Sequence, residues 1–201
     1  MATYGARNSF WAPFAENAQD TDKTKLPVYG EPKACGQLNK LVDSPNFVEG
    51  SLPGDDVIVL YEREFLNGTV SVEDVFIPMA DAATMLGAAY DDENGMAQGV
   101  DDKPPYIGRG HVTHHVGKSG NYWQAVFYPK LKAKPSGKDY TTRAKDINFV
   151  TDKMEYDWEP PVCGKYKVTK DFPTEAEANA YIQDLFKGTA QVPGLPKPAA
   201  G

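Results

Sequence analysis

The stretch YIGRGHVTHHVGKSGNYWQAVFYPKLK, residues 106–132, decides the fold class. In its second half Trp123, Ala125, Phe127 and Leu131 fall on one face of an extended chain, and Tyr122, Gln124, Tyr128, Lys130 and Lys132 fall on the other. A period of two is typical of a strand that buries one face. The turn residues Gly117-Lys-Ser-Gly120 interrupt the stretch, which therefore predicts an antiparallel β-hairpin.

A second hairpin is predicted upstream, over residues 55–77. Residues 55–65 are rich in Val, Ile, Leu and Tyr, and residues 69–77 begin with a clear alternation. Asn67-Gly68 lies between the two runs. A type I′ turn needs positive φ at both central residues, which Asn and Gly tolerate best, so the turn is expected at these two residues.

Two helices are expected beside the strands. Residues 78–87 predict a short helix that ends at Gly87 and shares a face among Met79, Ala82, Ala83 and Leu86. Residues 175–187 predict a longer one, with Thr174 as N-cap, Glu177 completing a capping box and Gly188 at the end. Its apolar face should dock on a sheet through Ala178, Tyr181, Ile182, Leu185 and Phe186.

The remaining segments complete a β-rich chain. Further strands are expected at residues 7–16, broken by Pro13; at 38–50, interrupted by Ser44-Pro45-Asn46; and at 143–150 and 162–172. Residues 17–27, 90–105 and 133–142 are interpreted as loops. Residues 189–201, rich in Pro, Gly and Ala, are expected to form a flexible tail that buries no core. The prediction is one mainly β domain with α over residues 1–188, followed by that tail.

Composition narrows the function classes. The 201 residues are 41% hydrophobic and 24% charged, which suits one domain with a real core. A net charge of −7 argues against a protein that grips nucleic acid through its phosphates. Cys35 and Cys163 lack metal or redox spacing and are expected to be reduced and half-buried. No apolar run resembles a signal or a membrane span, so we expect a cytoplasmic origin and no membrane partner.

His111, His114 and His115 lie close enough in sequence to be candidates for a metal site. His114 and His115 point to opposite faces of a strand, whereas His111 and His115 share a face but stand roughly 13 Å apart. One zinc ion binds its ligands at about 2.1 Å, so this spacing favours half-exposed strand residues and no metal.

Other motifs give no sign of catalysis. The acidic segment 91–95 lacks the register and the distal Glu of a calcium loop. The glycines at 108–110 and 117–120 do not form a phosphate loop, and no nucleophile elbow or zinc-protease motif occurs. The chain is therefore expected not to be an enzyme and to need no cofactor.

The order of several passages resembles the major tail proteins, or tail tube proteins, of long-tailed siphophages. The first two are Glu64-Phe-Leu-Asn-Gly-Thr-Val-Ser-Val-Glu-Asp74 and a short helix ending Met85-Leu-Gly87. Then come Pro105-Tyr-Ile-Gly-Arg-Gly110, Tyr122-Trp-Gln-Ala-Val-Phe-Tyr-Pro-Lys130 and residues 138–151 with Ile-Asn-Phe. The closing helix follows Phe172-Pro-Thr. The likeness spans residues 7–187 and does not include the Pro-rich tail.

The resemblance implies a β-sandwich or barrel-like core with a flanking helix. It implies hexameric rings that stack into a hollow tube around a tape-measure protein and later conduct DNA without binding it specifically. Tail-tip and tail-terminator proteins would be further partners. The place implied is the virion tail, assembled in the host bacterial cytoplasm. The family has no catalytic residue to carry over.

Charge is segregated along the chain, which suggests where subunits meet. Thirteen acidic residues and one base, Arg63, lie between residues 49 and 102, whereas bases dominate residues 128–145. We expect the acidic hairpin of one subunit to meet the basic loop of the next. The candidate interface residues are Asp55, Asp56, Glu62, Lys132, Lys134 and Lys138. The other interpretation of both runs is that they are solvated faces.

Other functions stay open at this point. A tail terminator or head–tail connector would form one ring and not a tube. A carbohydrate-binding β-sandwich would present its aromatic residues as an exposed platform. A metal-dependent enzyme that uses the histidines ranks last.

Overall fold

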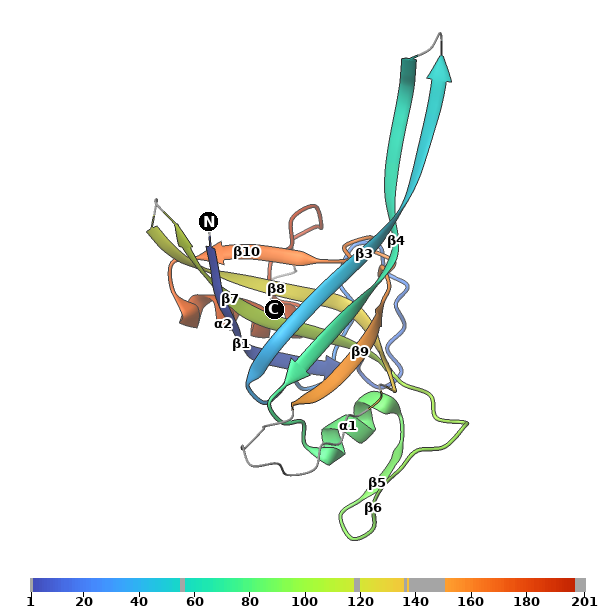
Figure 1. Cartoon of the computed structure of the whole chain (residues 1–201), viewed down its shortest axis with the longest axis vertical. Coiled ribbons are helices and arrows are strands. Elements are labelled where there is room, and N and C mark those ends of the chain that lie inside the picture. Colours follow the sequence, from blue (N-terminus) through green and yellow to red (C-terminus); the bar gives the residue numbers. More distant parts are fainter. Residues whose placement is uncertain (1, 55–56, 118–119, 136, 138–150, 198–201) are drawn as a thin grey trace, which may run out of the picture.

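The computed structural model describes residues 2–54, 57–117, 120–135, 137 and 151–197 (Figure 1). The strands are β1 Ala2–Pro13, β2 Lys33–Ala34, β3 Leu38–Gly54, β4 Val57–Asp74, β5 Ala89–Asp91, β6 Gly95–Ala97, β7 Tyr106–Gly117, β8 Gly120–Lys134, β9 Asp152–Trp158 and β10 Val168–Phe172. The helices are α1 Met79–Leu86 and α2 Glu175–Lys187. The chain is mainly β with two helices, as predicted.

One large antiparallel sheet has the strand order β2-β1-β7-β8-β9-β4-β3. Strand β8 pairs with β7 along one edge and shares its other edge between two strands. Trp123–Phe127 pair with β10, and Leu131–Lys134 pair with β9. The sheet therefore divides beside residues 128–130, and β5 with β6 forms a separate small hairpin.

Apolar side chains fill both faces of the sheet. The inner cluster lies within the curve of the sheet and includes Trp11 of β1, Val70 of β4, Tyr156 of β9 and Met85 of α1. The outer cluster lies between the other face and α2, where Phe127 and Phe186 meet edge to face at 4.9 Å. Strand β8 is buried on both sides because it lies between the two clusters.

Helix α2 is confirmed in detail. The hydroxyl of Thr174 accepts a hydrogen bond from the backbone N–H of Glu177 at 3.3 Å, and Gly188 ends the helix with φ 71°. All five residues of the predicted apolar face are buried. The expectation that residues 189–201 bury nothing is wrong for Val192, which is 5% exposed and belongs to the outer cluster.

The β7–β8 hairpin is confirmed, but its predicted faces are partly wrong. Ala125 and Phe127 join the outer cluster, whereas Leu131 joins the inner one. The register explains this change, since Arg109 pairs with Tyr128 but Ile107 pairs with Leu131, which leaves one extra residue in β8. Such a bulge turns all later side chains to the other face, and it is one of the few places where a sheet accepts a proline, here Pro129.

The turn predicted at Asn67-Gly68 is wrong. Both residues lie inside β4, where Asn67 pairs with Asn46 and Gly68 pairs with Pro45 on one side and Trp158 on the other. A side chain at Gly68 would meet the Trp158 ring at 2.8 Å, so close packing requires the glycine. Gly54 pairs with Val57, and residues 55–56 lie outside the described residues.

Other boundaries differ in smaller ways. Strand β1 begins at Ala2 instead of residue 7 and ends at Pro13, where the predicted strand was expected to break. Strand β3 continues through Pro45, which an edge strand tolerates. Helix α1 matches its predicted span, although Met79 is 54% exposed and Met85 is buried instead. Strand β10 begins at Val168 instead of residue 162, and β9 was not predicted. The segment 90–105, expected to be a loop, contains β6 and the end of β5. The strand expected at 143–150 lies outside the described residues.

Candidate assembly surface

The most distinctive surface is the part of the β3–β4 hairpin that leaves the body, residues 47–54 and 57–65, here called the arm (Figure 1). Strand β4 pairs with β9 only over Gly68–Asp74. From the Phe47–Phe65 pair to the Gly54–Val57 pair, the described part of the chain gives the arm no third strand. Both edges of the arm therefore carry backbone groups that a further strand can pair with.

Aromatic rings fix the arm at its base. Phe65 stacks on Tyr166 with ring centroids 4.0 Å apart and lies 4.9 Å from the Trp158 ring. Phe47, on the facing strand, meets Phe65 edge to face at 5.8 Å. The arm therefore leaves the body in a defined direction, set by residues of the C-terminal quarter of the chain.

Beyond its base the arm exposes apolar side chains. Val48, Leu60 and Tyr61 are each more than half exposed, at 53%, 52% and 55%. An isolated two-stranded hairpin in water is at best marginally stable, and its apolar side chains gain little until something covers them. The arm is therefore a surface suited to burial against another protein.

Charged groups accompany these apolar side chains. Arg63 pairs with Glu49 across the two strands at 3.2 Å, and its guanidinium lies 4.1 Å from the centre of the Phe47 ring. A hydrogen bond to Glu49 raises the pKa of Tyr61. Glu62 and Glu64 are exposed, which leaves the arm with an acidic surface.

A second exposed apolar surface, here called the α1 patch, consists of Val75, Phe76 and Met79. Their exposed fractions are 52%, 62% and 54%. It follows the end of β4 opposite to the arm, and Figure 1 shows α1 and the arm at opposite ends of the long axis of the molecule. Apolar surfaces at two ends suit contacts that repeat from one molecule to the next.

The structure places three of the six predicted interface residues. Glu62 is exposed on the arm, whereas Lys132 lies 5.5 Å from the centre of the Tyr106 ring on the body. Lys134 forms an ion pair with Asp157 of the same chain. Both residues line a shallow groove at the base of the arm, together with Asn46 and Asn67. Within the described part of the chain Glu62 pairs with neither lysine. Asp55, Asp56 and Lys138 lie outside the described residues.

Sequence reasoning missed the exposed apolar residues of the arm. The signal was present, because residues 57–61 form an uninterrupted apolar run within a long strand. A run without alternation is typical of a strand covered on both faces. Here the chain's own described residues do not cover Leu60 or Tyr61.

Each histidine lies against an aromatic ring. His114 stacks on Trp123 at 4.3 Å and His115 on Tyr122 at 4.8 Å. His111 is 3% exposed, so its predicted half-exposure is wrong, and burial lowers its pKa to about 3. Among the described residues, no three His, Cys, Asp or Glu side chains are grouped as a metal site would need.

The two cysteines are free and half-buried, as predicted. Burial raises the pKa of both thiols, which disfavours the nucleophilic thiolate.

The tryptophans do not form an exposed platform. Trp11 and Trp158 are buried in the inner cluster. Trp123 is half-buried, with His114 stacked on its ring and the Arg7 guanidinium 5.2 Å from its centre. A sugar ring needs a free aromatic face, so these residues do not favour a glycan site.

A buried ion pair lies inside the inner cluster. Arg109 donates to Asp74 at 2.7 Å and to the hydroxyl of Tyr156 at 3.0 Å, and both charged side chains are fully buried. Burial raises the pKa of Asp74 in spite of the neighbouring guanidinium. The pair joins β7, β4 and β9 in the interior, which suits a structural role.

The chain matches no protein-family model and none of the curated proteins. Neither helix in the described part of the chain is long and apolar enough to cross a membrane.

Proposed function

We propose that this chain is the structural subunit of a bacteriophage tail tube and not an enzyme. In this proposal rings of subunits, expected to be hexameric, stack around a tape-measure protein and later conduct DNA. The observation that carries it is the arm, because it presents apolar side chains and unpaired strand edges that the described part of its own chain leaves uncovered. The resemblance of the ordered passages to siphophage major tail proteins supports the same assignment.

The arm supplies a physical route to assembly. An extended hairpin binds a neighbour by adding strands to the edge of its sheet, where backbone hydrogen bonds give affinity and side chains give register. Contacts between unlike surfaces close into a ring when the rotation permits, and otherwise continue as a filament. The arm and the α1 patch, at opposite ends of the molecule, are unlike surfaces of this kind.

A tail tube would also contact other proteins of the virion. Tail-tip and tail-terminator proteins would contact the two ends, and the tape-measure protein would occupy the lumen during assembly in the host bacterial cytoplasm. The net charge of −7 suits a conduit in the virion tail that must let DNA pass without holding it.

Negative-stain electron microscopy tests the proposal. Purified protein at rising concentration, with and without a tail-tip initiator complex, is expected to form rings and tubes about 100 Å wide, a width estimated from domain size. Leu60→Ser, on the arm, should abolish them, whereas the matched change Val162→Ser at a 42% exposed site of the body should not. Single rings without tubes would indicate a terminator or connector. Monomers under every condition would refute assembly.

A salt series tests the predicted charge pairing between subunits. Lys132→Glu is a cleaner probe than a change at Lys134, because Lys134 already pairs with Asp157 in its own chain. The variant should slow assembly in low salt, and the difference from the parent protein should shrink as salt shortens the Debye length from about 10 Å at 0.1 M to about 3 Å at 1 M. Equal assembly rates at low salt would leave both charged runs as solvated faces.

A further inference from the structure

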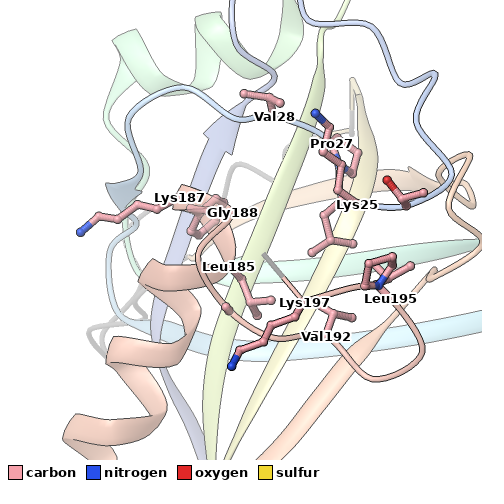
Figure 2. Close-up of a pocket in the computed structure, with 14 residues that line it drawn as sticks. Lys25, Pro27, Val28, Leu185, Lys187, Gly188, Val192, Leu195 and Lys197 are labelled. Atoms are coloured by element: carbon pink, nitrogen blue, oxygen red, sulfur yellow. The ribbon is translucent and has the colours of Figure 1, made fainter. Parts of the chain in front are cut away.

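A pocket lies where α2 ends, between residues 24–28 and residues 190–197 (Figure 2). Its volume is about 310 Å³, and Leu185, Val192 and Leu195 are among the apolar residues that line it. Leu185 and Val192 are almost fully buried, so they form the apolar floor of the pocket. The tube proposal makes no use of this pocket.

Three lysines are among the residues that line the pocket: Lys25, Lys187 and Lys197. Figure 2 shows the Lys187 side chain extending outward from the end of α2, away from the apolar floor. Lys25 pairs with Asp22 at 3.5 Å. Lys187 and Lys197 are exposed, and in the described part of the chain neither has an ion-pair partner. The chemistry that complements this pocket is an apolar side chain flanked by carboxylates.

The turn at residues 99–102 carries that chemistry. The backbone N–H of Gly99 donates to the Asp102 carboxylate at 2.9 Å, which fixes the turn. Val100 at its tip is fully exposed, at 102%, and Asp101 beside it is exposed as well. Lys103 follows directly, so the acidic character is confined to the tip. Nothing in the described chain covers this valine.

We propose that the turn at residues 99–102 of one copy inserts Val100 into the pocket of a second copy and brings Asp101 close to Lys187 and Lys197. The inserted residue, Val100, is here called the knob. The knob and the pocket belong to different parts of the same chain, so the contact is head to tail and can repeat along a stack. The inference rests on the proposed tube only for this repetition. The pairwise contact itself is tested separately.

Paramagnetic labelling tests the contact between full-length subunits. A nitroxide is attached at Gln98→Cys in a chain with Cys35→Ser and Cys163→Ser, and this chain is mixed with isotope-labelled protein. Both chains also carry Leu60→Ser, which is expected to keep the subunits dispersed. The label should broaden the amide signals of Leu185–Gly188 and Val192 at least threefold more than those of β9. The matched chain that also carries Val100→Asn and Asp101→Asn should lose this difference.

Two results would overturn the contact. The first is no broadening at the end of α2, and the second is equal broadening by the matched chain. If the first result is accompanied by a shift of the same amides on adding hexanoate, the pocket is assigned to a small amphipathic anion. None of these results depends on whether tubes form.

Charge exchange tests the same contact during assembly. Lys187→Glu with Lys197→Glu should raise the concentration needed for tubes at least tenfold, and adding Asp101→Lys should restore at least half of that loss. Unchanged assembly in the double variant would refute the knob-and-pocket contact and leave the proposed function intact. Failure of the parent protein to assemble would refute the proposed function, while the labelling experiment still decides the contact.

Discussion

Two long antiparallel hairpins of this chain have opposite surroundings. The β7–β8 hairpin is flanked by β1, β9 and β10 and covered by α2, so its central residues are buried on both faces. The arm of the β3–β4 hairpin has the same kind of pairing, but its described side chains beyond the base, at residues 48–51 and 60–64, are exposed. Local strand pairing is therefore common to both, and the surroundings decide which residues stabilise the fold. The body should be sensitive to substitution through folding, and the arm through association.

Substitution of two arginines, one in the body and one in the arm, should give the largest difference in unfolding free energy. Arg109 in the body and Arg63 in the arm each pair with a carboxylate and lie over an aromatic ring. Arg109→Met leaves Asp74 buried without its cation and should lower the free energy of unfolding by about 3–5 kcal/mol. Arg63→Met should cost no more than about 1 kcal/mol, because exposed pairs contribute little. Urea unfolding measures both, and similar losses would remove the distinction between the regions.

A pair of leucines sharpens the comparison without charge. Leu185 is 1% exposed beneath α2, whereas Leu60 is 52% exposed on the arm. Leu185→Ala should cost about 2–5 kcal/mol of unfolding free energy, since it opens a cavity in the outer cluster. Leu60→Ala should change stability by less than about 0.5 kcal/mol. A large loss at Leu60 in dispersed subunits would mean that the arm folds against its own body.

His111 should make the body sensitive to acid. Its pKa is about 3 in the folded chain and near 6.5 when exposed, so the unfolded chain binds more protons between these values. The stability contributed by neutral His111 is complete above about pH 6.5 and is lost as the pH falls, by up to about 1.4 kcal/mol per pH unit. His111→Phe should flatten the dependence between pH 6 and 4, measured by urea unfolding. An unchanged slope would show that His111 is not buried in solution.

Limited proteolysis tests how easily the arm opens. It requires no substitution and is the prediction with the smallest expected effect on stability. Arg63 is the only trypsin site between residues 49 and 102, and its side chain is 52% exposed. Few contacts with the body oppose local opening of the arm. In dispersed subunits trypsin should therefore cut after Arg63 before it cuts after Lys153 in β9. Assembled protein should resist the cut, as followed by mass spectrometry. Equal cleavage in both samples would indicate that assembly leaves the arm uncovered.

The sequence predicted best where local signals and burial agree. Helix α2 has its cap, its apolar face and its terminal glycine within one short segment, and all three were read correctly. Strand β9 has an equally clear pattern, because Met154, Tyr156 and Trp158 alternate with polar residues, yet the sequence prediction does not include it.

Long-range packing explains the main error. Asn67-Gly68 has the composition of a turn, yet Gly68 is present because the Trp158 ring, 90 positions away, leaves no room for a side chain. The candidate interface had the same difficulty. The sign of each charged run was visible in the sequence, but the pairing of Lys134 with Asp157 depends on the β8–β9 ladder.

The position of β9 between β8 and β4 also determines when, during translation, the base of the arm can form. The base of the arm is completed only when Asp152–Trp158 pair with Gly68–Asp74 and Tyr166 stacks on Phe65. At about 5–20 residues per second, a ribosome needs roughly 5–20 s to travel from Gly68 to Trp158. During that interval the nascent arm has no fixed direction. If subunits join through the arm, as proposed, a nascent chain presents a directed arm only after Tyr166 has been translated.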